Sequence, residues 1–350
     1  MHDSPKHRPA AGLSRPSGFV AIALAALLGL GACATEPTAL HVSDSVDNTL
    51  DGAAEGASEA SATELVYERL SDPPRTVVKD GSGQVVATFT DGARTVVVTG
   101  PERTFEEPTA TEATVTTTNW VRLAPREWSK GAEREDWFEP WFDAARRSKA
   151  KDVLGIAFEY VEGAPDGKKD GLRIKGDASF GPPNKTGSSR LEANDFYDYL
   201  GVDWKFPDVG LERAEARRYG SLDCSGYWRM VLGYRMGLKL RGSNDAGPGL
   251  PRRAYAIADH GPGVVVVPDK GRTATDYDAL QIGDLVFFET ENGGVLDHMG
   301  MYLGIDSFGR HRFLSSRAGA NGPTMGDIMG TSVLDDDGFY SRGWYTARRI

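Results

Sequence analysis

The sequence predicts an α+β protein in which a smaller, β-rich region precedes a larger region built from a helix and strands. In the first region, two β-branched runs flank Asp91-Gly92, a dipeptide that favours a tight hairpin turn. In the second region, apolar residues recur at helical spacing after Asp223, and apolar runs at 285–289 and 299–305 are typical of strands. At roughly 150 residues per domain, the 350-residue chain has room for about two such domains.

The first 32 residues have the layout of a secretory signal peptide. Their apolar run, FVAIALAALLGL, has 12 residues, whereas a membrane-spanning helix needs about 20. Three basic residues precede it: Lys6, Arg8 and Arg15. The run leads into Leu30-Gly31-Ala32-Cys33, which resembles a bacterial lipobox, whose cysteine becomes the first mature residue and carries lipid. We therefore predict an exported lipoprotein of the cell membrane that faces the cell wall, anchored through Cys33; an ordinary signal with an unrelated cysteine is the alternative.

Residues 33–63 are predicted to form a flexible tether, because they are rich in Ala, Ser, Thr, Glu and Asp and carry no apolar period. After removal of residues 1–32, 37 Lys and Arg remain against 49 Asp and Glu. This acidic balance does not suit nucleic-acid binding, which requires basic patches. A mean hydropathy of -0.39 leaves no room for several membrane spans.

Residues 64–186 are predicted to form a β-rich α+β domain whose role stays open. The stretch 133–150 has Trp137, Trp141 and Phe142 at helical spacing, which we interpret as core packing, and Pro140 is expected to kink or split this helix. The apolar run 152–161 fits either a helix or a strand. No catalytic constellation occurs in this part of the chain.

Residues 187–350 contain Cys224, which has no cysteine partner for a disulfide if Cys33 is acylated. Asp223 is a suitable N-cap for the apolar-periodic segment that follows, so Cys224 is placed at a helix N-terminus. Such a position favours the thiolate and lowers the thiol pKa. Ser225 and its neighbouring glycine leave room for a substrate, and backbone amides of this turn could hold an oxyanion. A buried structural cysteine is the alternative.

A catalytic base for Cys224 must come from three histidines of the folded part: His260, His298 and His311. His298 is expected to begin the second strand, where its side chain is held rigidly. His260 lies between turn residues in DHGPGVVVVPD and is expected in a surface loop. We therefore predict that His298 is the base.

Three ordered motifs resemble those of the NlpC-type cell-wall cysteine peptidases. They are Asp223-Cys224-Ser225-Gly226, the GDLVFF segment at 283–288, and the HMGMYLG segment at 298–304. The resemblance covers roughly residues 200–350 and includes Leu250-Pro251-Arg252. It implies a papain-like α+β fold, in which a Cys-bearing helix packs on an antiparallel sheet that bears the histidine. It also implies cleavage of peptide bonds in peptidoglycan stem peptides.

The third member of the implied triad departs from the family pattern, which has His, Asn or Gln on the strand after the histidine strand. Ser315 takes that place here. A turn at 306–309 would put His311 four to six residues from His298 along the ladder, which is about 13 to 20 Å and beyond hydrogen-bond reach. Ser315 is therefore predicted to orient the imidazole, with a nearby carbonyl group or a water molecule as the alternatives. The family's Tyr-x-Trp-Gly-Gly segment is also missing, and Tyr219 is a candidate substrate contact, although a core tyrosine fits equally well.

The sequence thus predicts a cysteine peptidase, a peptidoglycan endopeptidase, that needs no cofactor. The acidic run 335–337 fits a solvated turn, and we expect no metal site. Two alternatives stay open: an amidase or acyltransferase on the same fold, and a non-catalytic lipoprotein that binds the cell wall.

Overall fold

The computed structural model describes residues 64–291 and 293–350. The predicted signal peptide, the lipidation at Cys33 and the tether lie outside the described residues. Within the described part of the chain, no helix has the length and apolar character needed to cross a membrane.

The N-terminal part is an antiparallel sheet whose strands follow one another in the order of the sequence. The hairpin predicted around Asp91-Gly92 is confirmed, because β3 and β4 pair on either side of it, with Gly92 at a φ of 78°. Glycine adopts this left-handed conformation without the steric cost that a Cβ imposes. The strands are β1 (Val66–Leu70), β2 (Arg75–Lys79), β3 (Val85–Thr90), β4 (Thr95–Glu106) and β5 (Thr114–Leu123).

An aromatic cluster packs α1 (Phe138–Arg147) against this sheet. Its buried members include Phe89, Trp128 and Phe142, with Trp137 and Trp141 packed at its border, so the core interpretation of these aromatics is confirmed. The expected kink at Pro140 is wrong. Pro140 lies in the first turn of α1, where the missing N–H has no intrahelical partner to lose. The short 3-10 helix η1 (Ala132–Arg134) precedes α1.

The undecided run 152–161 is helical, with α2 (Val153–Ala157) followed by the 3-10 helix η2 (Phe158–Tyr160). Asp152 caps α2 by accepting a hydrogen bond from the Gly155 amide at 2.9 Å. Small elements lead from here to the cysteine helix: β6 (Gly167–Lys169), β7 (Leu172–Lys175), α3 (Phe196–Leu200), β8 (Trp204–Phe206), β9 (Gly210–Glu212) and η3 (Ala216–Arg218).

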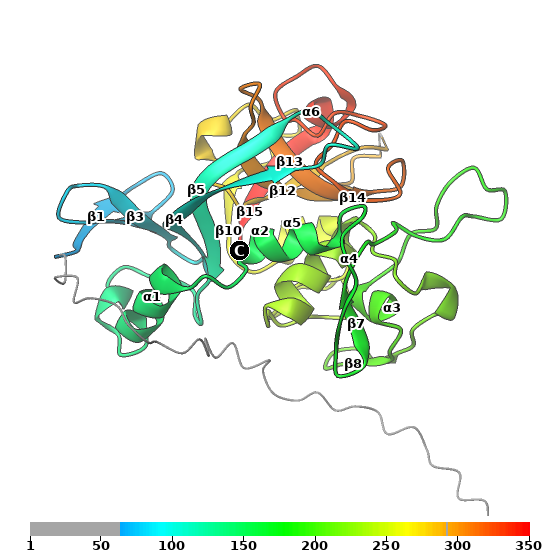
Figure 1. The fold of residues 1–350 in the computed structure, drawn as a ribbon, viewed down its shortest axis with the longest axis horizontal. Helices are drawn as coiled ribbons and strands as arrows, with labels where there is room; N and C mark the ends of the chain where they lie inside the picture. Colours follow the sequence, from blue (N-terminus) through cyan, green and yellow to red (C-terminus); the bar gives the residue numbers. More distant parts are fainter. Residues whose placement is uncertain (1–63, 292) are drawn as a thin grey trace, which may run out of the picture. The chain divides into compact units, whose positions relative to one another are not determined.

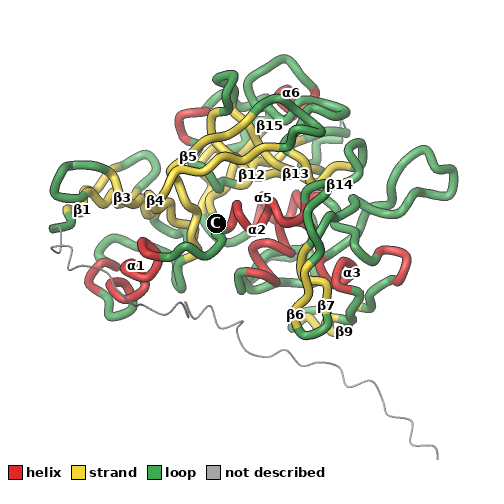
Figure 2. Tube along the Cα trace, in the orientation of Figure 1, coloured by secondary structure: helices red, strands yellow, loops and turns green. Residues whose placement is uncertain are grey.

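The C-terminal part is a second antiparallel sheet, in the order β10-β15-β11-β12-β13-β14, with helices against it (Figures 1 and 2). Helix α4 packs on β12 and β13, and α5 packs on β11, β12 and β15. The elements are α4 (Cys224–Trp228), the π-helix Arg229–Arg235, α5 (Ala254–His260), β10 (Val264–Val267), the 3-10 helix η5 (Tyr277–Ala279), β11 (Leu285–Phe288), β12 (His298–Ile305), β13 (His311–Arg317), β14 (Gly322–Thr324), α6 (Phe339–Gly343) and β15 (Trp344–Arg349). His260 therefore ends a helix, whereas the sequence predicted a loop.

The two faces of this sheet bury different clusters, because alternate residues of a strand point to opposite sides. Met299 and Met301 of β12 join the cluster that contains the helices α4 and α5. Phe288 and Phe313 join a second cluster with Tyr340 of α6. The predicted α+β architecture, with a cysteine-bearing helix packed on an antiparallel sheet after a β-rich region, is confirmed.

The last residues of the sequence join the two sheets. The Ile350 oxygen accepts hydrogen bonds from the backbone N–H groups of Arg94 and Thr95 and from the Thr95 hydroxyl. The buried Arg349 guanidinium pairs with Asp284, with Nε donating at 2.7 Å, and also donates to Thr90 at 2.7 Å. These contacts hold the start of β4 against the C-terminal sheet.

Candidate active site

Cys224 is the first residue of α4, at the helix N-terminus that the sequence predicted. Its N-cap is Asp223, whose carboxylate accepts a hydrogen bond from the Gly226 amide at 2.7 Å. The cysteine is partly exposed and has no disulfide partner. After one α-helical turn the segment continues as a π-helix to Arg235, a form that proteins use mostly in short pieces and frequently at functional sites.

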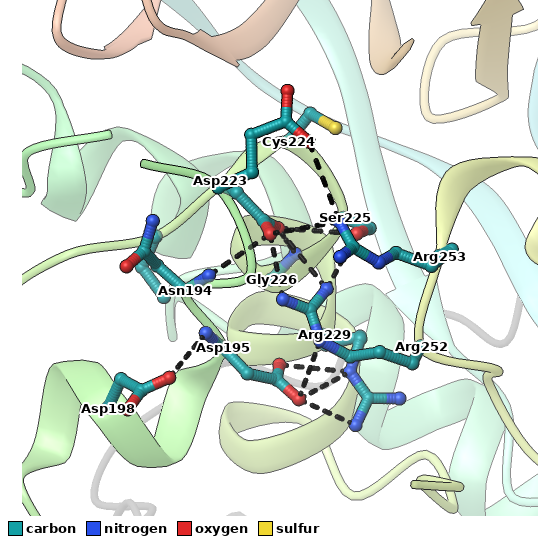
Figure 3. A network of polar contacts seen from close by, with 12 residues as sticks. Asn194, Asp195, Asp198, Asp223, Cys224, Ser225, Gly226, Arg229, Arg252 and Arg253 are labelled. Atoms are coloured by element: carbon teal, nitrogen blue, oxygen red, sulfur yellow. Dashed lines mark hydrogen bonds and ion pairs between the residues drawn. The ribbon is translucent and has the colours of Figure 1, made fainter. Parts of the chain in front are cut away.

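A buried ion pair fixes this helix from the side. Arg229 and Asp195 are both fully buried, and the guanidinium donates to the carboxylate through Nε and Nη2 at 2.9 Å (Figure 3). The remaining terminal nitrogen of Arg229 donates to the carbonyl oxygens of Leu250 and Pro251. Every charge in this pair is thus satisfied, which a buried pair requires if it is not to destabilise the fold.

A second pair fixes the N-cap itself. Arg252 donates to the Asp223 carboxylate at 2.7 Å and to the Ser225 hydroxyl at 2.8 Å. The Asp223 carboxylate also accepts a hydrogen bond from the backbone N–H of Asn194, and a Cβ at Gly226 would collide with the Asn194 carbonyl oxygen. Asp223 and Ser225 therefore help to hold the turn that carries Cys224.

Sequence reasoning missed Asp195, Arg229 and Arg252 as parts of this site. The sequence does contain a signal for Arg229. This charged residue lies between Trp228 and Val231, in a helix whose apolar residues recur at helical spacing. A charge at a buried helix position requires a buried partner. Its partner is 34 residues away in the sequence, so the pair itself could not be read from local pattern.

The structure brings Cys224 to the beginning of the histidine strand. The thiol donates a weak hydrogen bond to the carbonyl oxygen of Asp297 at 3.8 Å. His298 is the next residue and the first of β12. The predicted nucleophile and base are therefore neighbours in the fold, although 74 positions separate them in the sequence.

His298 lies in an aromatic surrounding and is 8% exposed. Its ring centroid is 5.7 Å from that of Phe288 and 5.4 Å from that of Tyr340. Within the described residues Nε2 is buried and has no hydrogen-bond partner. Burial, together with the positive charge of Arg317 and against an opposing contribution from Asp223, lowers the pKa of His298 to about 3.

Ser315 lies on the same face of the sheet as His298. The pairing of Met301 with Leu314, continued along the ladder, sets His298 opposite position 317 and diagonal to Ser315. Ser315 lies directly beside Gly300, the residue two positions after His298. A Cβ added to Gly300 would be only 3.2 Å from the Ser315 Cβ. Its hydroxyl is fully buried and, among the described residues, has no partner. The two unpartnered polar atoms thus belong to adjacent positions on one face.

The structure agrees with the exclusion of His311. It pairs across the ladder with Ile305, seven residues beyond His298, which corresponds to roughly 23 Å. Its Nδ1 is 2.8 Å from the Tyr302 hydroxyl. Tyr219 is half exposed and its ring lies by Gly201; its role in substrate binding stays a prediction.

The expected lowering of the Cys224 pKa is wrong in this structure. Burial raises the pKa of the thiol well above its usual value, and the carboxylates of Asp223 and Glu192 raise it further. The N–H of Ser225 and the charge of Arg252 act in the opposite direction but do not outweigh burial. One α-helical turn is a weak source of helix dipole, whereas desolvation disfavours the charged form strongly.

Tyr340 and Arg317 are site neighbours that the sequence did not reveal. The Arg317 guanidinium lies 4.9 Å from the centre of the Tyr340 ring, and it donates to the carbonyl oxygens of Gly326 and Gly330. Tyr340 comes from α6, a short helix for which the sequence analysis gave no prediction. No local pattern distinguishes this tyrosine from other loop aromatics.

The comparison with protein families agrees with the motifs. Residues 210–327 match the family model described as the NlpC/P60 family, and this segment includes Cys224, His298 and Ser315. A crystal structure of an NlpC/P60 family protein from Bacillus cereus ATCC 10987 matches with 16% identity over 82% of this chain and 79% of that chain, at a TM-score of 0.25. No match was found among curated proteins. Residues 210–327 are therefore similar to the NlpC/P60 family.

The depressed pKa of His298 predicts a specific dependence of stability on pH. In the unfolded chain the imidazole takes up a proton near pH 6.5, whereas in the folded chain it does so only near pH 3. Between these values the unfolded state binds more protons, so stability falls as the pH falls, by up to about 1.4 kcal/mol per pH unit. Urea unfolding of the wild type and of His298→Gln at several pH values measures this difference. Equal slopes for the two proteins between pH 6.5 and 4 would contradict it.

Proposed function

We propose that this protein is a cell-wall hydrolase that cleaves amide bonds in peptidoglycan stem peptides by a Cys–His mechanism. One observation carries the proposal: the thiol of Cys224, at the start of α4, lies against the residue that precedes His298. Both residues lie in the segment that matches the NlpC/P60 family. The activity is that of a cysteine peptidase, a peptidoglycan endopeptidase.

In the proposed reaction, His298 takes the proton of the Cys224 thiol and the sulfur attacks the amide carbonyl carbon. The carbonyl oxygen gains the charge of the broken π-bond, and backbone N–H groups of the first turn of α4 stabilise it. The imidazolium then gives its proton to the leaving amine as the C–N bond breaks. A water molecule, deprotonated by His298, attacks the thioester and releases the carboxylic acid and the free thiol.

The resting pair is neutral at neutral pH. The pKa of Cys224 is raised and that of His298 is lowered, so the thiol keeps its proton and the imidazole has none. A pre-formed thiolate–imidazolium pair is thus disfavoured, and His298 acts as a general base during the attack. The low pKa of His298 keeps the imidazole unprotonated, as a general base must be, but it also makes the imidazole a weak base.

We assign Ser315 as the positioning residue for His298. Its buried hydroxyl and the buried Nε2 of His298 have no other partner in the described part of the chain. Because an unpartnered buried polar group costs about 1 to 3 kcal/mol, a direct or water-mediated contact between the two would be favourable. With Nε2 engaged in this way, Nδ1 is the nitrogen that exchanges the proton with Cys224.

A non-catalytic wall-binding protein is the second candidate, and the raised pKa of Cys224 favours it. A thiol that keeps its proton in the absence of substrate is a weak nucleophile. The two candidates share the partner, peptidoglycan, but only the enzyme releases fragments.

We also propose that the chain is exported and anchored to the membrane through lipid on Cys33. The support is the lipobox-like sequence, and this residue lies outside the described part of the chain. Such an anchor would place the C-terminal domain next to its polymer substrate.

Incubation of the protein lacking residues 1–33 with bacterial peptidoglycan tests the function. Mass spectrometry of the soluble fraction is expected to show new stem-peptide fragments, whose ends name the bond that was cut. Cys224→Ala is the control and should release none. If wild type and control release the same material while both bind the polymer, the protein binds the cell wall without cutting it.

Replacement of Ser315 by Ala tests the positioning role. Loss of one hydrogen bond to the base, worth about 0.5 to 1.5 kcal/mol, is expected to lower kcat about two- to tenfold with little change in KM. Steady-state kinetics on a released-fragment assay measures both constants. The neighbouring Ser316, whose hydroxyl donates to the Leu222 carbonyl oxygen, provides the matched control, Ser316→Ala. An unchanged kcat in Ser315→Ala would remove Ser315 from the site.

A further inference from the structure

A cavity of about 250 Å³ lies away from Cys224, between the N-terminal sheet and the end of the cysteine helix. Its walls come from the ends of β4 and β5, from α1 and α2, and from the last turn of the π-helix. None of its twelve lining residues is acidic, and four are basic: Arg94, Arg122, Lys151 and Arg235. In a protein with a formal net charge of -10, such a concentration of positive charge requires an explanation.

Arg122 is the most deeply placed of the four. It is 8% exposed, and its two terminal nitrogens donate to the carbonyl oxygens of Ser148 and Ala150, both in the cavity wall. Its Nε is buried without a partner, and no described carboxylate lies within ion-pair distance of it. Burial lowers the pKa of Arg122, and the charge of Asp152, which pairs with Arg103, opposes this only in part.

Arg94, at another wall of the cavity, also carries a positive charge that no carboxylate pairs with in the described structure. Its Nε donates to the Ala124 carbonyl oxygen at 2.7 Å, and among the described residues no carboxylate forms an ion pair with its guanidinium. Burial lowers its pKa as well, with only a weak opposing effect from Glu127. In the described structure its terminal nitrogens have no hydrogen-bond acceptor, so they are available for a ligand.

The remaining two cations share one carboxylate outside the cavity lining. Glu159 pairs with Lys151 at 2.8 Å, with Arg235 at 2.8 Å and with Lys175 at 3.3 Å. Three positive charges therefore surround a single negative one, and an excess remains. A partly buried, uncompensated charge is costly, and a bound anion would offset that cost.

We propose that this cavity binds an oxyanion, a phosphate or carboxylate group carried by a small ligand. Guanidinium groups suit this chemistry, because their planar N–H donors match two oxygens of such a group. The volume lies just below the usual range for small-molecule sites, so it fits one charged group rather than a polymer segment. Trp141 and Met236 provide an apolar wall for the rest of the ligand.

This site is separate from the proposed peptidase centre. Arg235 ends the helical segment that Cys224 begins, and eleven residues of helix correspond to roughly 16 Å. The proposal therefore does not depend on the catalytic one. The Ile350 oxygen accepts hydrogen bonds from the backbone N–H groups of Arg94 and Thr95 and from the Thr95 hydroxyl. The Arg94 guanidinium does not take part in these contacts and can therefore bind a ligand.

Titration calorimetry of the full chain with inorganic phosphate and, separately, with acetate tests the proposal, with sodium chloride at equal ionic strength as the reference. Saturable binding of at least one probe is expected, together with a rise in Tm that chloride does not produce. The probe that binds identifies the group. Arg94→Gln is expected to weaken binding about tenfold or more, which corresponds to about 1.4 kcal/mol.

Two further variants keep the test decisive. Lys151→Gln, at an exposed position of the wall, should weaken binding, and it leaves the buried Glu159 carboxylate paired with Arg235 and Lys175. Arg147→Gln, an exposed residue of α1 that does not line the cavity, is the matched control and should bind as the wild type does. The proposal would be overturned if neither phosphate nor acetate showed saturable binding. It would also be overturned if Arg94→Gln bound the probe as tightly as the wild type while its Tm in chloride was unchanged.

Discussion

The position of Cys224 depends on two buried ion pairs, Arg229 with Asp195 and Arg252 with Asp223. Neither pair is a simple source of stability, because desolvation of the charges cancels most of their attraction. What they provide is a fixed geometry: each arginine also binds a second group, so neither can turn away without leaving a buried charge unpaired. Removal of one partner would cost far more than the pair contributes. The polar contacts drawn in Figure 3 therefore hold the turn that carries Cys224 in one place, and α4 packs against β12 and β13.

The same burial that fixes the site determines its chemistry. Because desolvation raises the pKa of Cys224 and lowers that of His298, the two groups rest as thiol and neutral imidazole. Arg317 adds to this by placing a positive charge near the imidazole, held through backbone carbonyl groups and the ring of Tyr340. In such a site, both Cys224 and His298 are neutral before the substrate binds. In the proposed reaction, proton transfer then accompanies the attack on the carbonyl, as in a serine hydrolase.

Local patterns predicted the parts of this structure that depend on neighbouring residues. The Asp223 cap, the strand that begins at His298, and the exclusion of His311 followed from short-range rules, because capping and ladder register act over a few residues. The partner of Arg229 could not be predicted, since Asp195 is 34 positions away and only the tertiary fold brings them together. The basic cavity was missed for the same reason, because its walls come from five separate elements. The pKa of Cys224 was predicted with the wrong sign, because burial cannot be read from a helix start.

The central claim is that Cys224 forms a covalent bond to the substrate with His298 as its base. The most direct measurement is acid quenching of the protein within the first turnover on a stem-peptide substrate, followed by intact-mass and peptide mass spectrometry. The account predicts an acyl adduct on the peptide that contains Cys224 in the wild type, and none in His298→Ala on the same timescale. Substrate consumption without any adduct, or an equal rate of adduct formation in His298→Ala, would contradict it.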